Sequence, residues 1–304
     1  MTHVVLVYAL LSRILSVLCS VIPVIFFNTG VPGAIIGLTL ASFGSFLVGM
    51  RLLTLPFKDV TRRKTDLTTA DILRFSMPVF SSSLYGFVIG SASQFFVSRY
   101  LGVENFAMFA NGYRELPIAG IVIGAVAGIL LPEFSRMTKG GSDSKQYLVL
   151  WKNVVLKSAA VIYPFSLYCC IFAPEIMGVL YGTVYREAAD LFRIVTIINL
   201  VRIVPYGPIM FALGKGKIFA KAHLVTALLL LGLDFLCVTF FPSLSAIAII
   251  ATTTTVFCLV VLMVSTARLL NTGLLGLMPW KSMFKILSVS TFSCFLGSCA
   301  VNLI

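Results

Sequence analysis

Long apolar runs separated by short polar connections make up most of this chain. A bilayer core needs about 20 predominantly apolar residues per helix, and the runs reach that length. The pattern predicts an all-α, polytopic integral membrane protein with about nine transmembrane helices. These predicted spans cover residues 4–26, 33–55, 78–98, 115–136, 155–174, 190–212, 219–241, 244–267 and 283–303.

The composition supports the same class of protein. Hydrophobic residues make up 59% of the chain and charged residues 11%, whereas a soluble domain carries about 25% charged residues. The net charge of +12 does not indicate nucleic acid as a partner, because the charges lie in the connections between apolar runs. The seven cysteines all lie in apolar runs without ligand spacing, so we expect neither a metal site nor disulfides.

Basic residues alternate between successive connections. Those at 56–77, 135–157, 213–221 and 268–285 hold sixteen of the 23 Lys and Arg residues. Because basic loops stay in the cytoplasm, the alternation places the N-terminus inside and the C-terminus outside a cytoplasmic (plasma or inner) membrane.

The start of the chain and an internal similarity suggest that upstream sequence is missing. The first predicted span follows Met1 almost directly, without the basic region of a signal peptide. Residues 3–51 and 223–270 both read as two helices ending in a similar motif, at an offset of about 220 residues. Parallel repeats are a known construction of transporters, and chance similarity between apolar helices is the alternative.

Two neighbouring predicted helices carry unusual faces. In 115–136, glycine recurs at every fourth residue, which lets another helix approach closely. In 78–98, small and polar residues recur at spacings of three and four and gather on one face. The members of this second face are Ser83, Gly86, Gly90, Gln94 and Ser98.

Three charged residues lie well inside predicted spans: Arg13, Arg202 and Asp234. A charge at the bilayer centre costs about 2.5–3.5 kcal/mol on insertion scales, so each needs a reason. The functional interpretation is a water-filled cavity with a net positive charge, because an arginine fork suits phosphate oxygens. The alternative is an internal ion pair that only stabilises the fold, and the repeat register places Asp234 beside Arg13.

Arg202 is the main candidate for a substrate-binding residue. Pro205 and Pro208 follow it closely and favour a break in the helix. Irregular backbone at membrane depth persists only against protein or water. Further candidates for the same cavity are Arg13, Gln94, Ser98, Asn199 and Tyr206. Helix–helix hydrogen bonding is the alternative for Gln94, Ser98 and Asn199. Tyr206 and Tyr113 are candidates for stacking on a sugar, with interfacial anchoring as the alternative for Tyr113.

Two acidic residues are candidates for ion coupling. Asp234 lies inside a predicted span, and Glu115 opens the span at 115–136. For Glu115 the alternative is a helix N-terminus, where the dipole favours a negative charge.

The segment 74–136 carries a set of motifs in a fixed order. A proline-started, serine-rich helix is followed by Arg-Tyr-Leu-Gly at 99–102, Phe-Ala-Asn-Gly-Tyr at 109–113, Leu-Pro at 116–117 and Leu-Pro-Glu-Phe-Ser at 131–135. This arrangement resembles the start of the second lobe in Wzx-type polysaccharide (O-antigen) flippases, whose superfamily includes the MATE drug exporters and the lipid II flippases.

The resemblance implies two helical lobes that face each other across a cavity. On that map, residues 1–57 are the last two helices of a first lobe that lacks four, and 58–77 form a basic cytoplasmic linker. Residues 78–270 are the six-helix second lobe, and 271–304 add one helix. The acidic residue that the family often carries in the helix at 78–98 is absent here, which puts a coupling site in that helix in doubt.

The resemblance implies a flippase for a polyprenyl-pyrophosphate-linked oligosaccharide in polysaccharide biosynthesis, such as that of lipopolysaccharide, without a cofactor. Expected partners are that lipid, membrane lipids and other polysaccharide-assembly membrane proteins. A MATE-like multidrug exporter is an alternative that requires acidic cavity residues. An enzyme is not expected, because no carboxylate pair stands out and the connections are short. A truncated fragment that does not transport is the remaining alternative.

Overall fold

The computed structural model describes residues 2–54, 68–115 and 117–301. Within these ranges every regular element is a helix, which confirms the all-α prediction. Seven of the described helices are long and apolar enough to span a membrane. The chain divides into two compact units, Met1–Leu67 and Thr68–Ile304.

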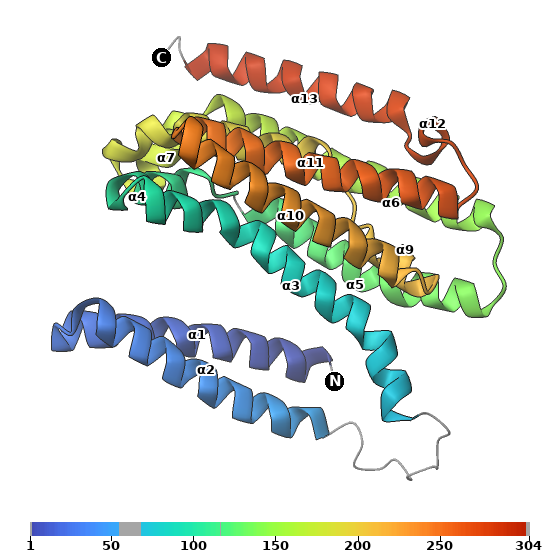
Figure 1. Ribbon diagram of the computed structural model, residues 1–304, viewed down its shortest axis with the longest axis horizontal. Helices are drawn as coiled ribbons and strands as arrows, with labels where there is room; N and C mark the ends of the chain where they lie inside the picture. Colours follow the sequence, from blue (N-terminus) through green and yellow to red (C-terminus); the bar gives the residue numbers. More distant parts are fainter. Residues whose placement is uncertain (1, 55–67, 116, 302–304) are drawn as a thin grey trace. The chain divides into compact units, whose positions relative to one another are not determined.

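The first unit is a hairpin of α1 (Thr2–Phe27) and α2 (Gly30–Thr54), joined by a two-residue turn (Figure 1). Gly37 of α2 faces the backbone of α1 so closely that an added Cβ would lie 1.8 Å from the carbonyl oxygen of Cys19. Gly33 and Ala41, four residues to either side, are also buried. This small-residue ladder joins the two helices.

The second unit is a bundle whose long helices run roughly side by side, with the short helices at their ends (Figure 1). The helices α4 and α7 lie at one end, and α9 and α12 at the other. Its elements are α3 (Thr69–Tyr100), α4 (Val103–Gly112), α5 (Pro117–Lys139), α6 (Ser144–Ile171), α7 (Ala173–Tyr181), η2 (Thr183–Ala188), α8 (Ala189–Thr196), η3 (Ile197–Leu200), α9 (Gly207–Ala212), α10 (Gly216–Phe240), α11 (Leu244–Leu269), α12 (Leu274–Leu277) and α13 (Trp280–Val301).

Helix α3 begins nine residues before the predicted start at Pro78. A capping box sets this start: the Asp71 amide donates to the Thr68 hydroxyl, and the Asp71 carboxylate accepts from the Thr68 amide. Both groups satisfy backbone donors that a helix start leaves free. The connection predicted at 99–114 also differs, since most of it forms α4.

The predicted span 190–212 is not one helix. It consists of α8, the 3₁₀ turn η3, an irregular stretch at 201–206 and α9. Pro205 cannot donate a backbone hydrogen bond, and Pro208 stands at the start of α9. The break expected beside Arg202 is therefore confirmed. The other predicted span outside the group of seven is 283–303, which corresponds to α13.

The glycine ladder of α5 contacts no helix among the described residues of the second unit. A Cβ added at Gly120, Gly124 or Gly128 would meet nothing within 4 Å. Helix α5 instead packs through other positions, among them Leu130 and Phe134, which are fully buried. Within the second unit the structure therefore shows no helix against this ladder, and a contact with the first unit stays a prediction.

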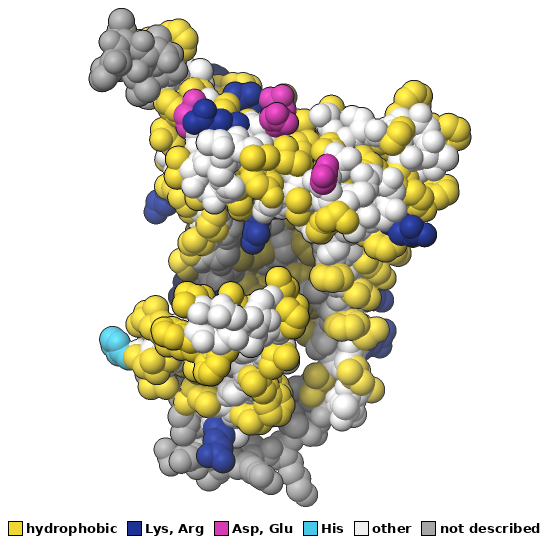
Figure 2. Space-filling model, turned by 90° about the vertical axis from the view of Figure 1, so that its left-hand side faces the viewer, with side chains coloured by type: hydrophobic (Ala, Val, Ile, Leu, Met, Phe, Trp, Pro, Cys, Tyr) yellow, Lys and Arg dark blue, Asp and Glu magenta, His cyan; other side chains and the backbone are white. Residues whose placement is uncertain are grey.

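Large hydrophobic side chains are exposed along the long helices. Figure 2 looks along the helices from the end that carries α4 and α7, where hydrophobic side chains are exposed beside acidic and basic ones. An exposed apolar surface of this extent suits contact with lipid rather than water. The chain is a multi-pass membrane protein.

Candidate functional site

Arg202 and Glu115 form an ion pair inside the second unit. The Arg202 Nη2 atom donates to Glu115 Oε2 and, at 3.4 Å, to Asn199 Oδ1. Both charged side chains are largely shielded, with exposed fractions of 32% for Arg202 and 19% for Glu115. An internal ion pair was the alternative for Arg202, but its partner was expected among the other intramembrane charges and is instead Glu115.

The break in the helical segment between η3 and α9 places Arg202 beside Glu115. The Arg202 amide still donates to the Ile198 carbonyl at 2.9 Å, so the side chain leaves the last turn of the helical segment. The neighbouring Leu200 carbonyl accepts a hydrogen bond from the Tyr163 hydroxyl of α6 at 3.1 Å. Helix α6 therefore satisfies a backbone acceptor at the edge of the break.

Asp234 of α10 is bound by Ser93 of α3. The Ser93 hydroxyl donates to Asp234 Oδ2 at 2.7 Å. Asp234 is fully buried, and its Oδ1 atom has no hydrogen-bond partner among the described residues. A buried carboxylate is costly unless a proton or a cation compensates its charge. Among the described residues of the second unit, Asp234 is therefore a buried carboxylate whose charge still requires a proton or a cation.

Tyr113 lies near both of these pairs. Its hydroxyl lies 3.0 Å from the Thr252 hydroxyl of α11. Burial raises the pKa of Tyr113 to about 12; the nearby charges of Glu115 and Asp234 also raise this pKa, whereas that of Arg202 lowers it. These residues form one group, the polar cluster, between α3, the α4–α5 connection, the broken helix, α10 and α11. Its members are Ser93, Tyr113, Glu115, Asn199, Arg202, Asp234 and Thr252.

The other predicted site residues lie outside this cluster. Arg13 belongs to the first unit, where it is exposed, and its proximity to Asp234 stays a prediction. Gln94 is half-buried and Ser98 is exposed on α3. Tyr206 is buried, with its ring centroid 5.4 Å from that of Trp151. A sugar could stack on Tyr206 only after the core opened there.

Ser93 and Thr252 were not predicted as site residues, and Tyr113 was predicted only as a residue that stacks on a sugar or anchors at the interface. A usable signal was present for Thr252, because four consecutive threonines at 252–255 interrupt an otherwise apolar run. Ser93 has no comparable signal, since it is one of many serines in its helix. Its importance follows only from the packing of α3 against α10.

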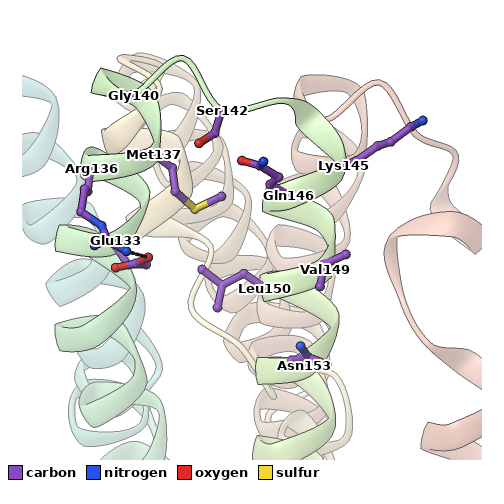
Figure 3. Close-up of a pocket in the computed structure, with 10 residues that line it drawn as sticks. All are labelled: Glu133, Arg136, Met137, Gly140, Ser142, Lys145, Gln146, Val149, Leu150 and Asn153. Carbon is purple, nitrogen blue, oxygen red and sulfur yellow. Dashed lines mark hydrogen bonds and ion pairs between the residues drawn. The ribbon is translucent and has the colours of Figure 1, made fainter.

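A pocket of about 690 Å³ opens between α5 and α6 at the end of the helices away from the polar cluster. Figure 3 shows Ser142 and Gln146 turned toward the gap, whereas Lys145 extends away from it. The wall toward α5 carries the ion pair between Glu133 and Arg136, at 2.6 Å. This pocket is lined by charged, polar and apolar side chains, and no sequence motif had indicated it.

These observations describe a multi-pass membrane protein with charged residues paired inside a helical bundle. Residues 2–190 match the model of a family described as polysaccharide biosynthesis protein. The match covers more than half of the chain, so the chain belongs to this family. Neither a search of curated proteins nor a search of solved structures found a significant match.

The family match divides the polar cluster. Ser93, Tyr113 and Glu115 lie within the matched residues, whereas Arg202 and Asp234 lie beyond them. The resemblance to polysaccharide flippases is thus confirmed at the level of polysaccharide biosynthesis.

Proposed function

We propose that the chain acts in a flippase that moves a polyprenyl-pyrophosphate-linked oligosaccharide from the cytoplasmic to the outer leaflet of the cytoplasmic membrane. The observation that carries this proposal is Arg202, held on a broken helix within a polar cluster and opposed by Glu115. A sugar head group with a charged linker cannot cross hydrocarbon unaided. Membership of a polysaccharide biosynthesis family supports the substrate class.

The pyrophosphate would bind Arg202 by replacing Glu115. Phosphate oxygens suit the two-pronged guanidinium at least as well as a carboxylate does. Protonation of Glu115 would remove its negative charge and release Arg202 for the substrate. Binding free energies are reciprocal, so a proton at Glu115 and a pyrophosphate at Arg202 would each favour the other.

Asp234 would provide a second coupling site. Its carboxylate is buried beside Ser93, and one oxygen has no partner among the described residues. A proton or a small cation bound there would change the charge of the cluster by one unit. We assign Asp234 and Glu115 to ion coupling, and Arg202 with Asn199 to the substrate.

The cavity would lie along the glycine faces of α3 and α5. Added Cβ atoms at Gly86, Gly90, Gly120 and Gly124 meet no described atom within 4 Å. In this proposal residues 78–270 are the second lobe, 271–304 an additional helix, and the first unit part of the opposite lobe. Alternating access would expose the cavity to one side of the membrane at a time. Other polysaccharide-assembly membrane proteins would be partners of the chain.

A MATE-like exporter of cationic drugs is the second candidate. It is favoured by Asp234, because a fully buried carboxylate suits a cationic substrate. The ion pair weakens this candidate, since Glu115 is already neutralised by Arg202. Drug resistance in a strain expressing the chain distinguishes the two functions.

The experiment that tests flipping is complementation of glycan export in a flippase-deficient strain, with protein levels checked. Arg202→Lys keeps the charge but loses the bidentate fork, so we expect most export to be lost. The matched control is Arg114→Lys, an exposed arginine close to the cluster in sequence. Full export with Arg202→Lys would contradict the substrate role.

A further inference from the structure

Two pockets adjoin on the surface of the α3–α10 pair, at the end where α9 meets α10. One has a volume of about 280 Å³ and the other about 440 Å³. Arg74, Pro78 and Lys217 line both of them. The larger pocket is lined only by residues of α3 and α10, and we name it the α3–α10 groove.

A close helix contact shapes the shared wall. An added Cβ at Gly216 would lie 3.3 Å from the Pro78 Cβ and 2.9 Å from Phe211 Cδ1. Glycine therefore lets the start of α10 approach α3 at this point. A larger residue would push the helices apart and change the groove.

The groove is positively charged at its helix-end side. Arg74, Lys217 and Lys221 line it and are exposed. No carboxylate among the described residues lies within ion-pair distance of these three. Asp71 also lines the smaller pocket, but its carboxylate caps α3 by accepting from the Thr68 hydroxyl at 2.6 Å. The groove thus carries three positive charges, and the adjoining smaller pocket adds one negative charge.

The groove becomes apolar toward the middle of the helices. Met77 and Tyr85 of α3 and Leu224 of α10 line this part. The eleven residue steps from Arg74 to Tyr85 span about 16 Å along a helix axis. Cations at the membrane surface and apolar side chains below them match the chemistry of a lipid with an anionic head group.

We propose that the α3–α10 groove binds an anionic glycerophospholipid of the surrounding leaflet. The lipid phosphate lies among Arg74, Lys217 and Lys221, and an acyl chain follows the apolar part of the groove. The small volume argues against the oligosaccharide of the transport substrate. The groove shares no residue with the polar cluster, so this proposal does not depend on the proposed function.

The test uses the purified full chain in nanodiscs of phosphatidylcholine to which phosphatidylglycerol is added. Lipid retained by the protein is quantified by native mass spectrometry. The triple variant Arg74→Gln, Lys217→Gln, Lys221→Gln should bind phosphatidylglycerol at least about tenfold more weakly, because each basic residue contributes to attraction of anionic lipid. The matched control is Lys139→Gln, Lys281→Gln, Lys285→Gln, which removes the same charge from exposed lysines outside the groove and should change binding less than about twofold.

A second variant tests the apolar part without changing charge. Leu224→Trp should fill the groove and weaken retention of phosphatidylglycerol, while unfolding in pure phosphatidylcholine stays unchanged for all variants. Equal losses in the two triple variants would overturn the proposal, since they would show a non-specific effect of charge. Displacement of the lipid by inorganic phosphate alone, or tighter binding of polyprenyl phosphate than of phosphatidylglycerol, would also overturn it.

Discussion

Arg202 and Glu115 lie 87 positions apart in sequence and form an ion pair within the helical bundle. The pair neutralises the arginine that had been expected to give the interior a positive charge. In the described part of the second unit, Asp234 is then the buried charge without an opposite charge beside it. Function would therefore depend on exchange of the Arg202 partner rather than on a permanently positive cavity.

A double-mutant cycle separates a structural ion pair from a substrate site. Arg202→Leu or Glu115→Leu alone leaves a shielded charge without its partner, so we expect each to destabilise the protein by about 1–3 kcal/mol. The double variant should recover most of this stability, because two apolar residues can replace a buried pair. Thermal unfolding in detergent measures the cycle.

Export measured with the same variants decides the role of Arg202. The double leucine variant should fold and still fail to export glycan if Arg202 binds pyrophosphate. Recovery of export together with stability would show that the pair is purely structural.

Asp234→Asn tests whether Asp234, which accepts a hydrogen bond from Ser93, takes part in ion coupling. Asparagine keeps the volume and can accept the Ser93 hydrogen bond, so we expect a folded protein whose export no longer depends on the proton or sodium gradient. Ser93→Ala is the matched control, because it removes one hydrogen bond, worth about 1 kcal/mol, and keeps the carboxylate. Unchanged gradient dependence in Asp234→Asn would exclude Asp234 from coupling.

The sequence predicted the spans better than the site. Hydrophobic runs report burial in lipid or protein, so the long helices were recognisable, and the prolines after Arg202 indicated the break. The pairing of Arg202 could not be deduced in the same way. Glu115 sits at a predicted helix start, where the helix dipole alone explains a glutamate.

Glycine spacing identified a kind of helix face but not its neighbour. Small residues at the same spacing occur at Gly33, Gly37 and Ala41, where α2 packs on α1, and at 120, 124 and 128, where an added Cβ would meet no described atom within 4 Å. A ladder that contacts a helix and a ladder that is open have the same sequence pattern, so only the structure distinguishes them.

Substitution at the two ladders should therefore give opposite results for folding. Gly37→Leu should disrupt the first unit, because a Cβ there already meets the Cys19 carbonyl at 1.8 Å. Gly124→Leu should leave expression and unfolding close to normal, because no described atom contacts that position. If Gly124→Leu unfolds the protein as Gly37→Leu does, the face of α5 is packed in the membrane and does not line an open cavity.

One set of reporter fusions can test both the orientation predicted from the basic loops and whether the broken segment 189–212 crosses the membrane. Reporter fusions after Lys64, Lys139, Lys217 and Lys281 should report the cytoplasm, because basic connections stay inside. Fusions near Glu104, Arg186 and Ser243 should report the outside.

The most informative pair of fusions is Arg186 and Lys217, which flank the broken segment. Helix α8 packs against α4, and α9 packs against α5 and α10. Since α4 and α9 lie at opposite ends of the bundle (Figure 1), we expect the segment to cross the membrane although no single helix spans it. Reporters on the same side at these two sites would show that the broken segment does not cross. Two or more reversed reporters elsewhere would refute the orientation as a whole.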